Sequence, residues 1–380
     1  MSPQREIGIA VIGVGWIGQV HCQAYRQIPD VYPDLPVKPR VRMIVDAVEP
    51  VARRVAERFD VEVHEEDWHK AINDPAIEAV DICVMNRLHE PIAAAAAKAG
   101  KHIFCEKPLA NTVAEATRMV EAVDGAGVVN VVGFNYRHLP AIQTAREMIE
   151  SGALGEIFHF RGLFAVDDKA SPDVPWAWRF SAEEAGGGAL CTLGSHTLDL
   201  ARYLVGDFDS VTAMTRTLIG ERPVRGTDTT RSVDVEDMAG MLIRFEQGAT
   251  GVLETTWLAQ GNKHHHSWEI NGSKGSLRYN SERMNELEWY DGTSAGNRRG
   301  FRTLLMGPAF PAAAAFLHMP GMGMSYADGM VIELKDFVAA IAGETTPNAS
   351  FLDGLEVVRI TEAALRSSRD ERWVELRDAP

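Results

Sequence analysis

The first third of the chain alternates short apolar runs with segments of helical periodicity. Apolar, β-branched runs predict strands over residues 7–12, 41–45, 79–84, 102–106 and 128–133. Pro50 opens a helix that carries Val51, Val55 and Phe59 on one face, and further helices are predicted over 90–99 and 113–123. Strands that alternate with crossover helices are typical of a doubly wound, parallel sheet.

After about residue 136 the pattern changes to many short strands. These strands are predicted over 157–165, 210–218, 237–245, 250–257, 267–271, 276–279 and 286–290. Turns as short as 246–248 and 272–275 join only antiparallel neighbours. Helices are predicted over 140–151, 193–205, 327–342 and 352–367, and the stretch 292–324, rich in Gly, Pro and Met, is expected to be a loop.

These two patterns predict an α/β protein of two domains. Residues 1–135 are expected to form a Rossmann domain with a doubly wound parallel sheet. Residues 136–380 are expected to form an α+β domain with a large, mostly antiparallel sheet. A chain of 380 residues is also longer than one ordinary core requires, which favours the same division.

Composition narrows the class of protein. The formal net charge is −15 and the chain lacks a basic stripe, so nucleic acid and anionic membranes are not expected partners. No stretch approaches ~20 uninterrupted apolar residues, so a membrane span is not expected. The four cysteines form no CxxC pair, which is typical of reduced, buried thiols. The sequence therefore predicts a soluble, cytoplasmic protein with a small-molecule substrate.

A glycine-rich turn follows the first predicted strand and opens a helix. Its sequence, GVGWIG, spans residues 13–18. In a G-x-G-x-x-G motif at this place, Gly13 permits the tight turn, Gly15 lets the backbone approach a pyrophosphate, and Gly18 lets helix and strand pack closely. The amide groups at the helix start, around Trp16 and Ile17, then face the phosphates. This context predicts a dinucleotide site.

Asp46 directly follows the second predicted strand, where an acid binds the adenosine ribose hydroxyls. It lies further along the chain than usual because four prolines, Pro29, Pro33, Pro36 and Pro39, mark an inserted loop before the strand. An acid there would repel the extra phosphate of NADP, and NAD is therefore the predicted cofactor. The alternative is an Asp beside a helix with no ligand.

Two further strand ends carry residues suited to chemistry, because ligands bind outside the carboxyl ends of parallel strands. The sequence NRLH (86–89) follows the third predicted strand, and EKP (106–108) follows the fourth. Oxidation of an alcohol needs a proton acceptor within hydrogen-bond reach of the hydroxyl. Lys107, held between a carboxylate and a proline, is a candidate functional residue on these grounds alone.

At this point the sequence resembles the Gfo/Idh/MocA oxidoreductase family over nearly its whole length. The motifs that carry the resemblance occur in this order: GVGWIG (13–18), NRLH (86–89), EKP (106–108), GFNYR (133–137), GALGEI (152–157), GGGA (186–189) and GSHTLD (194–199). The proline-containing loop before Asp46, WRF (178–180), NGSKGS (271–276) and GFRT (300–303) look further like the levoglucosan dehydrogenase branch of that family.

The resemblance implies a catalytic pair. Lys107 would bind the reacting hydroxyl and stabilise its developing negative charge, and His196 would act as general base. Family members often carry an aspartate four residues before the histidine, where this chain has Thr192. Threonine cannot raise the pKa of His196 as a carboxylate would. Asp199, one helical turn beyond His196, either takes part of that role or bonds elsewhere.

The resemblance also implies contacts with cofactor and sugar. Asn86 and His89 would lie along the cofactor, Glu106 and Asn135 near the nicotinamide, and Trp178 and Arg179 near its ribose. Tyr136 and Arg137 would border the sugar pocket, together with Thr192 and Asp199.

Three consecutive histidines raise the question of a metal site, which the sequence does not favour. Of His264, His265 and His266, only the first and third share one face of a strand, and no Cys, Asp or Glu lies close enough in sequence to complete a site. Polar or pocket-facing strand residues are the expected account, and no metal is predicted.

The leading hypothesis is hydride transfer to NAD from a secondary hydroxyl of a sugar, glycoside, anhydrosugar or cyclic polyol, at ring carbon 3 of a pyranoside. One alternative is a glycosidase that uses bound NAD for transient oxidation, and the other is a dinucleotide-binding sensor without turnover. Lys107 and His196 together argue against the sensor, which needs neither. The resemblance also suggests a homodimer or homotetramer that pairs through the strand-rich domain.

Overall fold

A computed structural model describes residues 5–294, 296 and 299–378, and the chain divides into two compact units. Unit 1 contains Met1–Ala110, Ala114–His138 and Met324–Leu355. Unit 2 contains Asn111–Val113, Leu139–Gly323 and Glu356–Pro380. None of the helices in the described segments is both long and apolar enough to cross a membrane.

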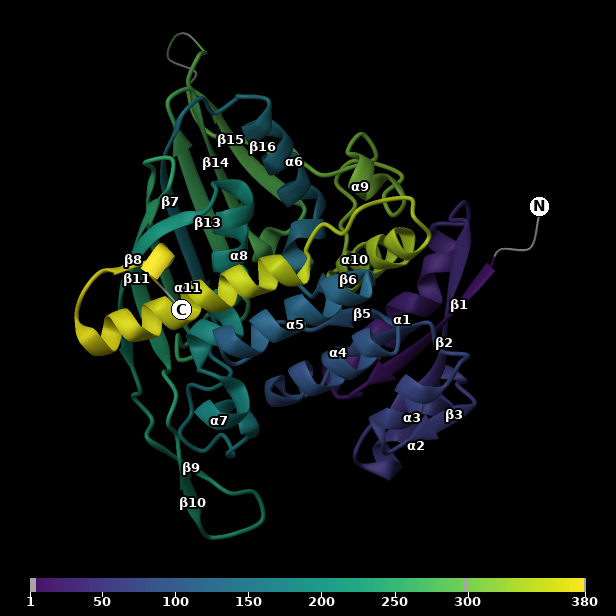
Figure 1. Ribbon diagram of the computed structural model, residues 1–380. Helices are drawn as coiled ribbons and strands as arrows, with labels where there is room; N and C mark the ends of the chain where they lie inside the picture. The colour runs from purple at the N-terminus through teal and green to yellow at the C-terminus, as the bar shows by residue number, and fades with distance from the viewer. Residues whose placement is uncertain (1–4, 295, 297–298, 379–380) are drawn as a thin grey trace. The chain divides into compact units, whose positions relative to one another are not determined.

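Unit 1 is built on a six-stranded parallel sheet with the order β3-β2-β1-β4-β5-β6 (Figure 1). Its strands are β1 (Arg5–Ile12), β2 (Val37–Val45), β3 (Val63–Glu65), β4 (Ala79–Ile82), β5 (His102–Cys105) and β6 (Asn130–Val132). The order reverses between β1 and β4, which is the topological switch point of a doubly wound sheet. The predicted Rossmann fold is confirmed.

Helices connect these strands and cover the sheet. They are α1 (Trp16–Val31), α2 (Glu49–Phe59), α3 (Trp68–Asn73), η1 (Asn86–Leu88), α4 (His89–Lys98), α5 (Val113–Ala126), η2 (Asn135–His138) and α10 (Tyr326–Ile341). The strand residues Ile7, Ile9, Ile44 and Ile103 are fully buried. Helices therefore shield both faces, as a parallel sheet requires.

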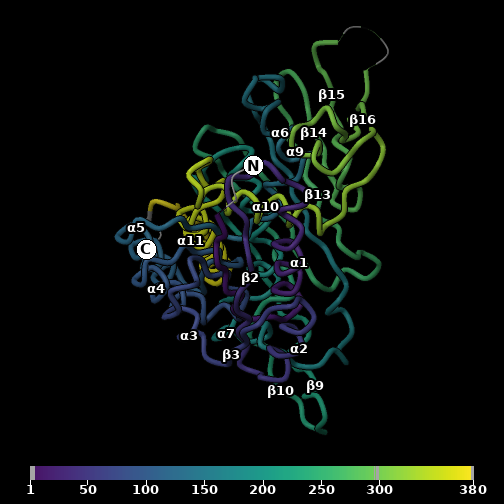
Figure 2. Tube along the Cα trace, turned by 90° about the vertical axis from the view of Figure 1, so that its right-hand side faces the viewer, coloured from purple at the N-terminus to yellow at the C-terminus, as the bar shows by residue number. Residues whose placement is uncertain are grey.

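Unit 1 differs from the expected domain 1–135 because residues 324–355 return to it. Helix α10 packs against α1, which is visible in Figure 2. The backbone N–H of Val132 donates to the carbonyl of Ala349 (3.0 Å), and the N–H of Phe351 donates to the side chain of Asn130 (2.8 Å). A late segment of the chain therefore completes the open edge of β6.

The proline-rich insertion before Asp46 is shorter than predicted. Pro29 lies inside α1, near its C-terminal end, and Pro39 lies inside β2. Pro39 pairs with Ile7 of β1, while β3 pairs with β2 only over Met43–Val45. The missing N–H of proline is tolerated on the unpaired side of a strand. Only the stretch around Pro33 and Pro36 remains as a loop.

Unit 2 is built on a sheet of nine strands in the described part of the chain, in the order β16-β15-β14-β13-β7-β12-β11-β8-β17 (Figure 1). The strands are β7 (Ile157–Ala165), β8 (Phe208–Arg216), β11 (Met238–Phe245), β12 (Thr250–Thr256), β13 (His265–Gly272), β14 (Gly275–Asn280), β15 (Glu286–Asp291), β16 (Arg302–Leu305) and β17 (Val374–Glu375). Strands β7 and β12 pair in parallel and the other neighbours are antiparallel. The predicted α+β domain is confirmed.

The other elements of unit 2 are short, apart from three helices. They are α6 (Pro140–Glu150), η3 (Trp178–Phe180), α7 (Ala182–Ala185), the π-helical turn η4 (Leu190–Gly194), α8 (Ser195–Leu204), β9 (Glu221–Pro223), β10 (Thr230–Ser232), η5 (Ser281–Arg283), α9 (Pro311–Ala314), the later part of α11 (Phe351–Asp370) and η6 (Leu376–Asp378). Helix α8 packs on β7.

The stretch 292–324 is not the continuous loop that the sequence predicts. It contains β16 and α9, although much of the rest is irregular. Strand β16 pairs with β15, and the guanidinium of Arg302 lies 4.5 Å from the ring centre of Trp289. The prediction was wrong here because a neighbouring strand, and not the local pattern, gives this segment its conformation.

Candidate functional site

Five predicted site residues follow the carboxyl ends of five parallel strands of unit 1. They are Gly13 after β1, Asp46 after β2, Asn86 after β4, Glu106 after β5 and Asn135 after β6. The sheet hydrogen bonds continue past these strand ends. The N–H of Gly13 donates to Val45 (2.7 Å) and the N–H of Glu106 donates to Ile82 (2.9 Å). The sheet thus brings these residues to one edge.

The three motif glycines meet different demands in the turn. Gly13 has a φ of 88°, and a Cβ there would lie 2.7 Å from the carbonyl oxygen of Cys83. A Cβ on Gly18 would lie 2.1 Å from the carbonyl oxygen of Gly13. A Cβ on Gly15 would meet no described atom within 4 Å. Gly13 and Gly18 therefore serve the chain's own packing, whereas Gly15 borders open space.

The start of α1 is suited to an anion. Gly15 is its N-cap residue and offers no side chain, and the first turn holds no acidic residue. Trp16 is 68% exposed and stacks on Tyr326, with ring centres 5.9 Å apart, while Ile17 is half-buried. Uncapped amides at a helix start attract phosphate groups. The turn therefore fits the pyrophosphate of a dinucleotide.

The carboxylate of Asp46 is held at the same turn. One oxygen accepts a hydrogen bond from the N–H of Val14 (3.1 Å), and the other accepts one from the N–H of Val48 (3.0 Å). These bonds fix the carboxylate beside the glycine turn and leave Asp46 half-buried. An acid in this position fits the ribose hydroxyls of NAD.

His89 is fully buried and binds backbone. Its Nδ1 lies 3.0 Å from the carbonyl oxygen of Pro108, and its Nε2 lies 3.2 Å from that of Val84. Burial lowers the pKa of His89. The imidazole therefore ties the end of β4 to the segment that carries Lys107. Asn86, three residues earlier, is 7% exposed.

Glu106 and Lys107 follow β5, and the peptide bond between Lys107 and Pro108 is cis. Glu106 is 9% exposed, and one of its oxygens accepts a hydrogen bond from the N–H of Lys107 (3.2 Å). Burial raises the pKa of Glu106, while the charges of His21 and Lys107 act in the opposite direction. Lys107 is half-buried between two buried neighbours.

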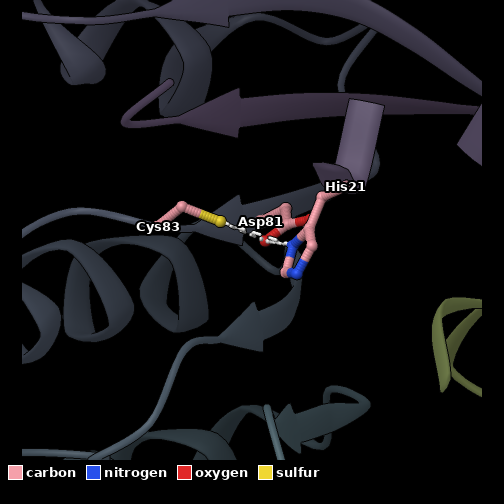
Figure 3. Close-up of side chains that lie close together, drawn as sticks. All are labelled: His21, Asp81 and Cys83. Carbon is pink, nitrogen blue, oxygen red and sulfur yellow. Dashed lines mark hydrogen bonds and ion pairs between the residues drawn. The ribbon is translucent and has the colours of Figure 1, made fainter. Parts of the chain in front are cut away.

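The sequence interpretation missed a buried polar cluster beside these residues. Figure 3 shows His21 of α1 pointing toward Asp81 of β4, with the sulfur of Cys83 directed at the same carboxylate. The possible ligand atoms of these three residues all lie within 4.8 Å of one another. An aspartate inside an apolar strand was the available signal, because buried carboxylates need partners.

Residues 135–137 lie in η2 of unit 1. Asn135, Tyr136 and Arg137 are 4%, 3% and 3% exposed. The guanidinium of Arg137 donates to the carbonyl of Asn348 (2.6 Å) and to Asp353 (3.1 Å). These contacts join η2 to the returning segment of the chain.

In unit 2, His196 lies near the start of α8, directly after the π-helical turn that contains Thr192. Its side chain is 8% exposed, and its ring centre lies 6.1 Å from that of Phe164. Thr192 is half-buried, and Asp199, three residues beyond His196, is 1% exposed. Single π turns of this kind occur often at functional sites.

Glu236 anchors the segment before His196, and the sequence interpretation missed it. Its carboxylate accepts hydrogen bonds from the N–H groups of Gly188 and Leu190, both at 2.9 Å. A Cβ on Gly188 would lie 1.9 Å from the Glu236 carbonyl oxygen. Close packing on Glu236 therefore explains the glycine at position 188, and the two hydrogen bonds position the segment that leads to the helix start.

His265 and His266 begin β13 and point to opposite sides of it, as alternation along a strand requires, while His264 directly precedes the strand. His266 stacks on Phe164 at 4.4 Å, and its Nε2 lies 3.1 Å from the hydroxyl of Thr197. Burial lowers the pKa of His266 to about 3. His264 packs edge-on against the same phenylalanine, while His265 binds Glu282 (2.9 Å).

Trp178 and Arg179 form the 3₁₀ turn η3 of unit 2. The guanidinium of Arg179 lies 4.2 Å from the ring centre of Trp178. Trp178 is half-buried and Arg179 is exposed. The cation stacks on the ring and limits the conformations of both side chains.

Comparison with known proteins agrees with this geometry. Residues 7–134 match the family profile described as an oxidoreductase family with an NAD-binding Rossmann fold. Residues 142–278 match the GFO/IDH/MocA C-terminal domain.

Several relatives match nearly the whole chain. Levoglucosan dehydrogenase of Pseudarthrobacter phenanthrenivorans is 40% identical, with 98% of both chains covered. Myo-inositol 2-dehydrogenase of Thermotoga maritima is 29% identical over 97% of this chain and 98% of the relative. A solved levoglucosan dehydrogenase in complex with NADH and levoglucosan superposes with a TM-score of 0.95, at 40% identity, over 98% of this chain and all of the other (100%).

The parallel sheet, the glycine turn and the matches over both units agree. NAD is the cofactor. The chain therefore belongs to the Gfo/Idh/MocA family, whose members are NAD-dependent oxidoreductases acting on CH–OH groups.

Proposed function

We propose that this protein oxidises a secondary hydroxyl of a pyranoside or anhydrosugar, at ring carbon 3. The observation that carries the proposal is the 40% identity to levoglucosan dehydrogenase over 98% of both chains. Lys107 and His196, which the proposed chemistry uses, are present in this chain. The inositol dehydrogenases among the relatives share less sequence, which favours a sugar over a cyclitol.

The proposed roles follow from the chemistry of the side chains. Bound NAD supplies the hydride acceptor. The ammonium of Lys107 donates a hydrogen bond to the reacting hydroxyl and stabilises the negative charge that develops there. The imidazole of His196 accepts the hydroxyl proton. Thr192 leaves His196 without the usual carboxylate four residues before it, so Asp199 is the nearest acid on the same helical face.

The remaining assignments concern binding. For the cofactor we propose contacts from Gly13, Gly15, Trp16, Ile17, Gly18, Asp46, Asn86, Glu106, Lys107, Asn135, Trp178 and Arg179. For the sugar we propose Lys107, Tyr136, Thr192, His196 and Asp199. His89 and Arg137 bind backbone and carboxylate groups of unit 1, which favours a role in positioning the neighbouring cofactor and sugar residues.

A screen for NADH formation tests the function directly. Levoglucosan, simple pyranosides and inositols are offered with NAD, and absorbance of NADH is followed. We expect turnover with levoglucosan or a pyranoside, and a 3-keto product by NMR. Product lacking its aglycone, without net NADH, would favour the glycosidase. Binding of NAD without turnover of any of these compounds would favour the sensor.

Asp46 is expected to select NAD over NADP. The Asp46→Asn variant should bind NAD about 10-fold to 100-fold more weakly, because a hydrogen bond to a charged group contributes about 1.5–3 kcal/mol. It should also use NADP better than the wild type does, because the repulsion of the 2′-phosphate is gone. Steady-state kinetics with both cofactors measure the change. Asp34→Asn, at an exposed position in the preceding loop, is the control. An unchanged cofactor preference would remove Asp46 from the proposed site.

We also propose that a second copy of the chain covers one face of the unit 2 sheet. A row of cross-strand neighbours on this face runs Arg278, Glu269, Arg161, Val252 and Leu242. Leu242 is 50% exposed and Val252 is 40% exposed. Apolar residues beside charges of both signs suit a self-complementary contact.

Leu242→Lys is therefore expected to reduce the mass of the particle in solution. The added charges would face each other across the contact at each copy. Light scattering after size-exclusion chromatography should give a dimer or tetramer for the wild type and a smaller species for the variant. Leu352→Lys, at another exposed leucine (57%), is the control. A wild-type monomer would contradict the proposal.

A further inference from the structure

Ionisable side chains form a buried cluster beside the glycine turn, at a place where apolar side chains would be enough for packing. His21 and Asp81 both have fully buried side chains. His21 comes from α1, one helical turn after Gly18, and Asp81 comes from the centre of β4. The Nδ1 atom of His21 lies 2.9 Å from one Asp81 oxygen and 3.2 Å from the other (Figure 3).

The other nitrogen of His21 faces a second carboxylate. Its Nε2 atom lies 3.5 Å from an oxygen of Glu106. The other oxygen of Glu106 accepts the hydrogen bond from the Lys107 N–H (3.2 Å). A Cβ on Gly133 would lie 2.8 Å from Glu106 Oε1, so close packing also fixes this carboxyl group. The imidazole is therefore enclosed between two acids.

When both neighbouring carboxylates are ionised, an imidazole in this position has one protonation state that suits both of them. A neutral ring donates from one nitrogen and presents a lone pair at the other, whereas the imidazolium donates from both. A lone pair directed at a carboxylate is repulsive, and a buried carboxylate without a cation is costly. Asp81 and Glu106 together also raise the pKa of His21 against the effect of burial.

Cys83 is a neutral donor to Asp81, and burial together with the same carboxylate raises the pKa of the buried Tyr25 hydroxyl of α1. The Cys83 sulfur lies 3.2 Å from Asp81 Oδ1. Burial and the nearby carboxylates raise the pKa of this thiol far above its usual range. A metal ion at this place would need the thiolate. The separations between these atoms are those of hydrogen bonds, which favours a protonated cluster over a metal centre.

We propose that His21 is a buried imidazolium that holds Glu106 ionised beside Lys107. Charges then alternate along the row Asp81, His21, Glu106 and Lys107, and each buried charge has an opposite neighbour. His21 is a positioning residue, because it acts on the reacting hydroxyl only through Glu106 and Lys107. Its effect on turnover rests on the proposed function, but its charge does not.

The charge is measured without any assay of activity. The full-length protein is labelled with ¹⁵N-histidine, and the imidazole signals are followed by NMR between pH 6 and pH 9. The signal missing from His21→Gln belongs to His21. We expect both nitrogens of His21 to remain protonated at pH 8. A neutral ring at that pH would overturn the proposal, and so would one equivalent of zinc in the purified protein. The expected result can fail while the sugar screen succeeds, and the reverse also holds.

Kinetics then test the link to Lys107. An opposite charge within ∼4–6 Å typically shifts a pKa by about 1–3 units. In His21→Gln, Glu106 takes up a proton and Lys107 loses its anionic neighbour. We expect the alkaline limb of the kcat profile to move to lower pH by about one unit. Cys83→Ala, which removes a neutral member of the same cluster, should leave the profile in place.

The outcomes are distinguishable when His21→Gln is destabilised. A structural role alone would lower the melting temperature and leave the pH profile unmoved in the folded fraction. Infrared spectra give a second readout, because a protonated Glu106 adds a carboxylic C=O band that the wild type lacks. An unshifted limb together with no new band would overturn the proposal. If the variant does not fold, Asp81→Asn supplies the reference for assigning the NMR signal.

Discussion

Replacing Lys107 by methionine is expected to lower kcat/KM for sugar oxidation by about 10³-fold, within the usual range for a group that donates to a developing oxyanion. Methionine keeps most of the length of the side chain but has neither the charge nor a donor. Lys107 is half-buried and its neighbours Glu106 and Pro108 are buried. We therefore expect that no water molecule takes over the hydrogen bond that the ammonium group would donate. Initial rates of NADH formation measure the loss.

Two controls separate chemistry from binding. The dissociation constant of NAD, measured by fluorescence titration, should rise by no more than about 100-fold in Lys107→Met, less than the loss in kcat/KM, because one hydrogen bond to a charged group contributes about 1.5–3 kcal/mol. Lys98→Met, at the exposed end of α4, should leave both quantities unchanged. Oxidation by Lys107→Met at the wild-type rate would exclude Lys107 from the mechanism.

Alanine at two glycines of the same turn is expected to give opposite results. Gly15→Ala should keep the melting temperature and bind NAD at least about 100-fold more weakly, because its methyl group meets no described atom of the protein and enters the space that the pyrophosphate would occupy. Gly18→Ala should destabilise the fold by about 3 kcal/mol, because its methyl group would lie 2.1 Å from the carbonyl oxygen of Gly13.

Calorimetry and NAD titration of both variants test this pair. Gly125→Ala is the control, since Gly125 lies in α5 with no described atom within 4 Å of its added Cβ. That variant should be as stable as the wild type or slightly more so, because alanine favours helix. A Gly15→Ala variant with wild-type NAD affinity would contradict the assignment of the turn.

The strands of unit 1 could be predicted because the local sequence of each strand matches the burial of its two faces. The run 7–12 is apolar throughout and becomes β1, whose residues Ile7, Ile9 and Val11 are fully buried. In a parallel sheet both faces are covered, so the local pattern and the final structure agree. The same reasoning placed Gly13 and Asp46 at strand ends.

The elements that could not be predicted depend on partners far away in the chain. Strand β16 exists because β15 offers it an edge, and Pro39 lies inside β2 because that side of the strand is unpaired. No short stretch of the sequence contains the information that determines either of these features. Glu236 is similar: its two amide partners are 48 and 46 residues distant.

The candidate site divides in the same way. Its strand-end residues follow from topology, whereas the charge of His21 depends on Asp81, 60 residues away, and on Glu106. A histidine shortly after a glycine turn gives no functional signal by itself. An acid inside an apolar strand indicates a buried partner, but the sequence does not show which residue that partner is. The distance of 2.9 Å between His21 Nδ1 and Asp81 Oδ2 is what identifies the two residues as partners.

The return of residues 324–355 to unit 1 has a consequence for biosynthesis. The edge of β6 and one side of α1 receive their partners from α10 and from Ala349, near the end of the chain. During translation, β6 keeps an open edge until residues 324–355 have been made, after eight of the nine described strands of the unit 2 sheet. We therefore expect stable binding of NAD only late in synthesis, and a fragment ending at residue 135 lacks part of its own fold.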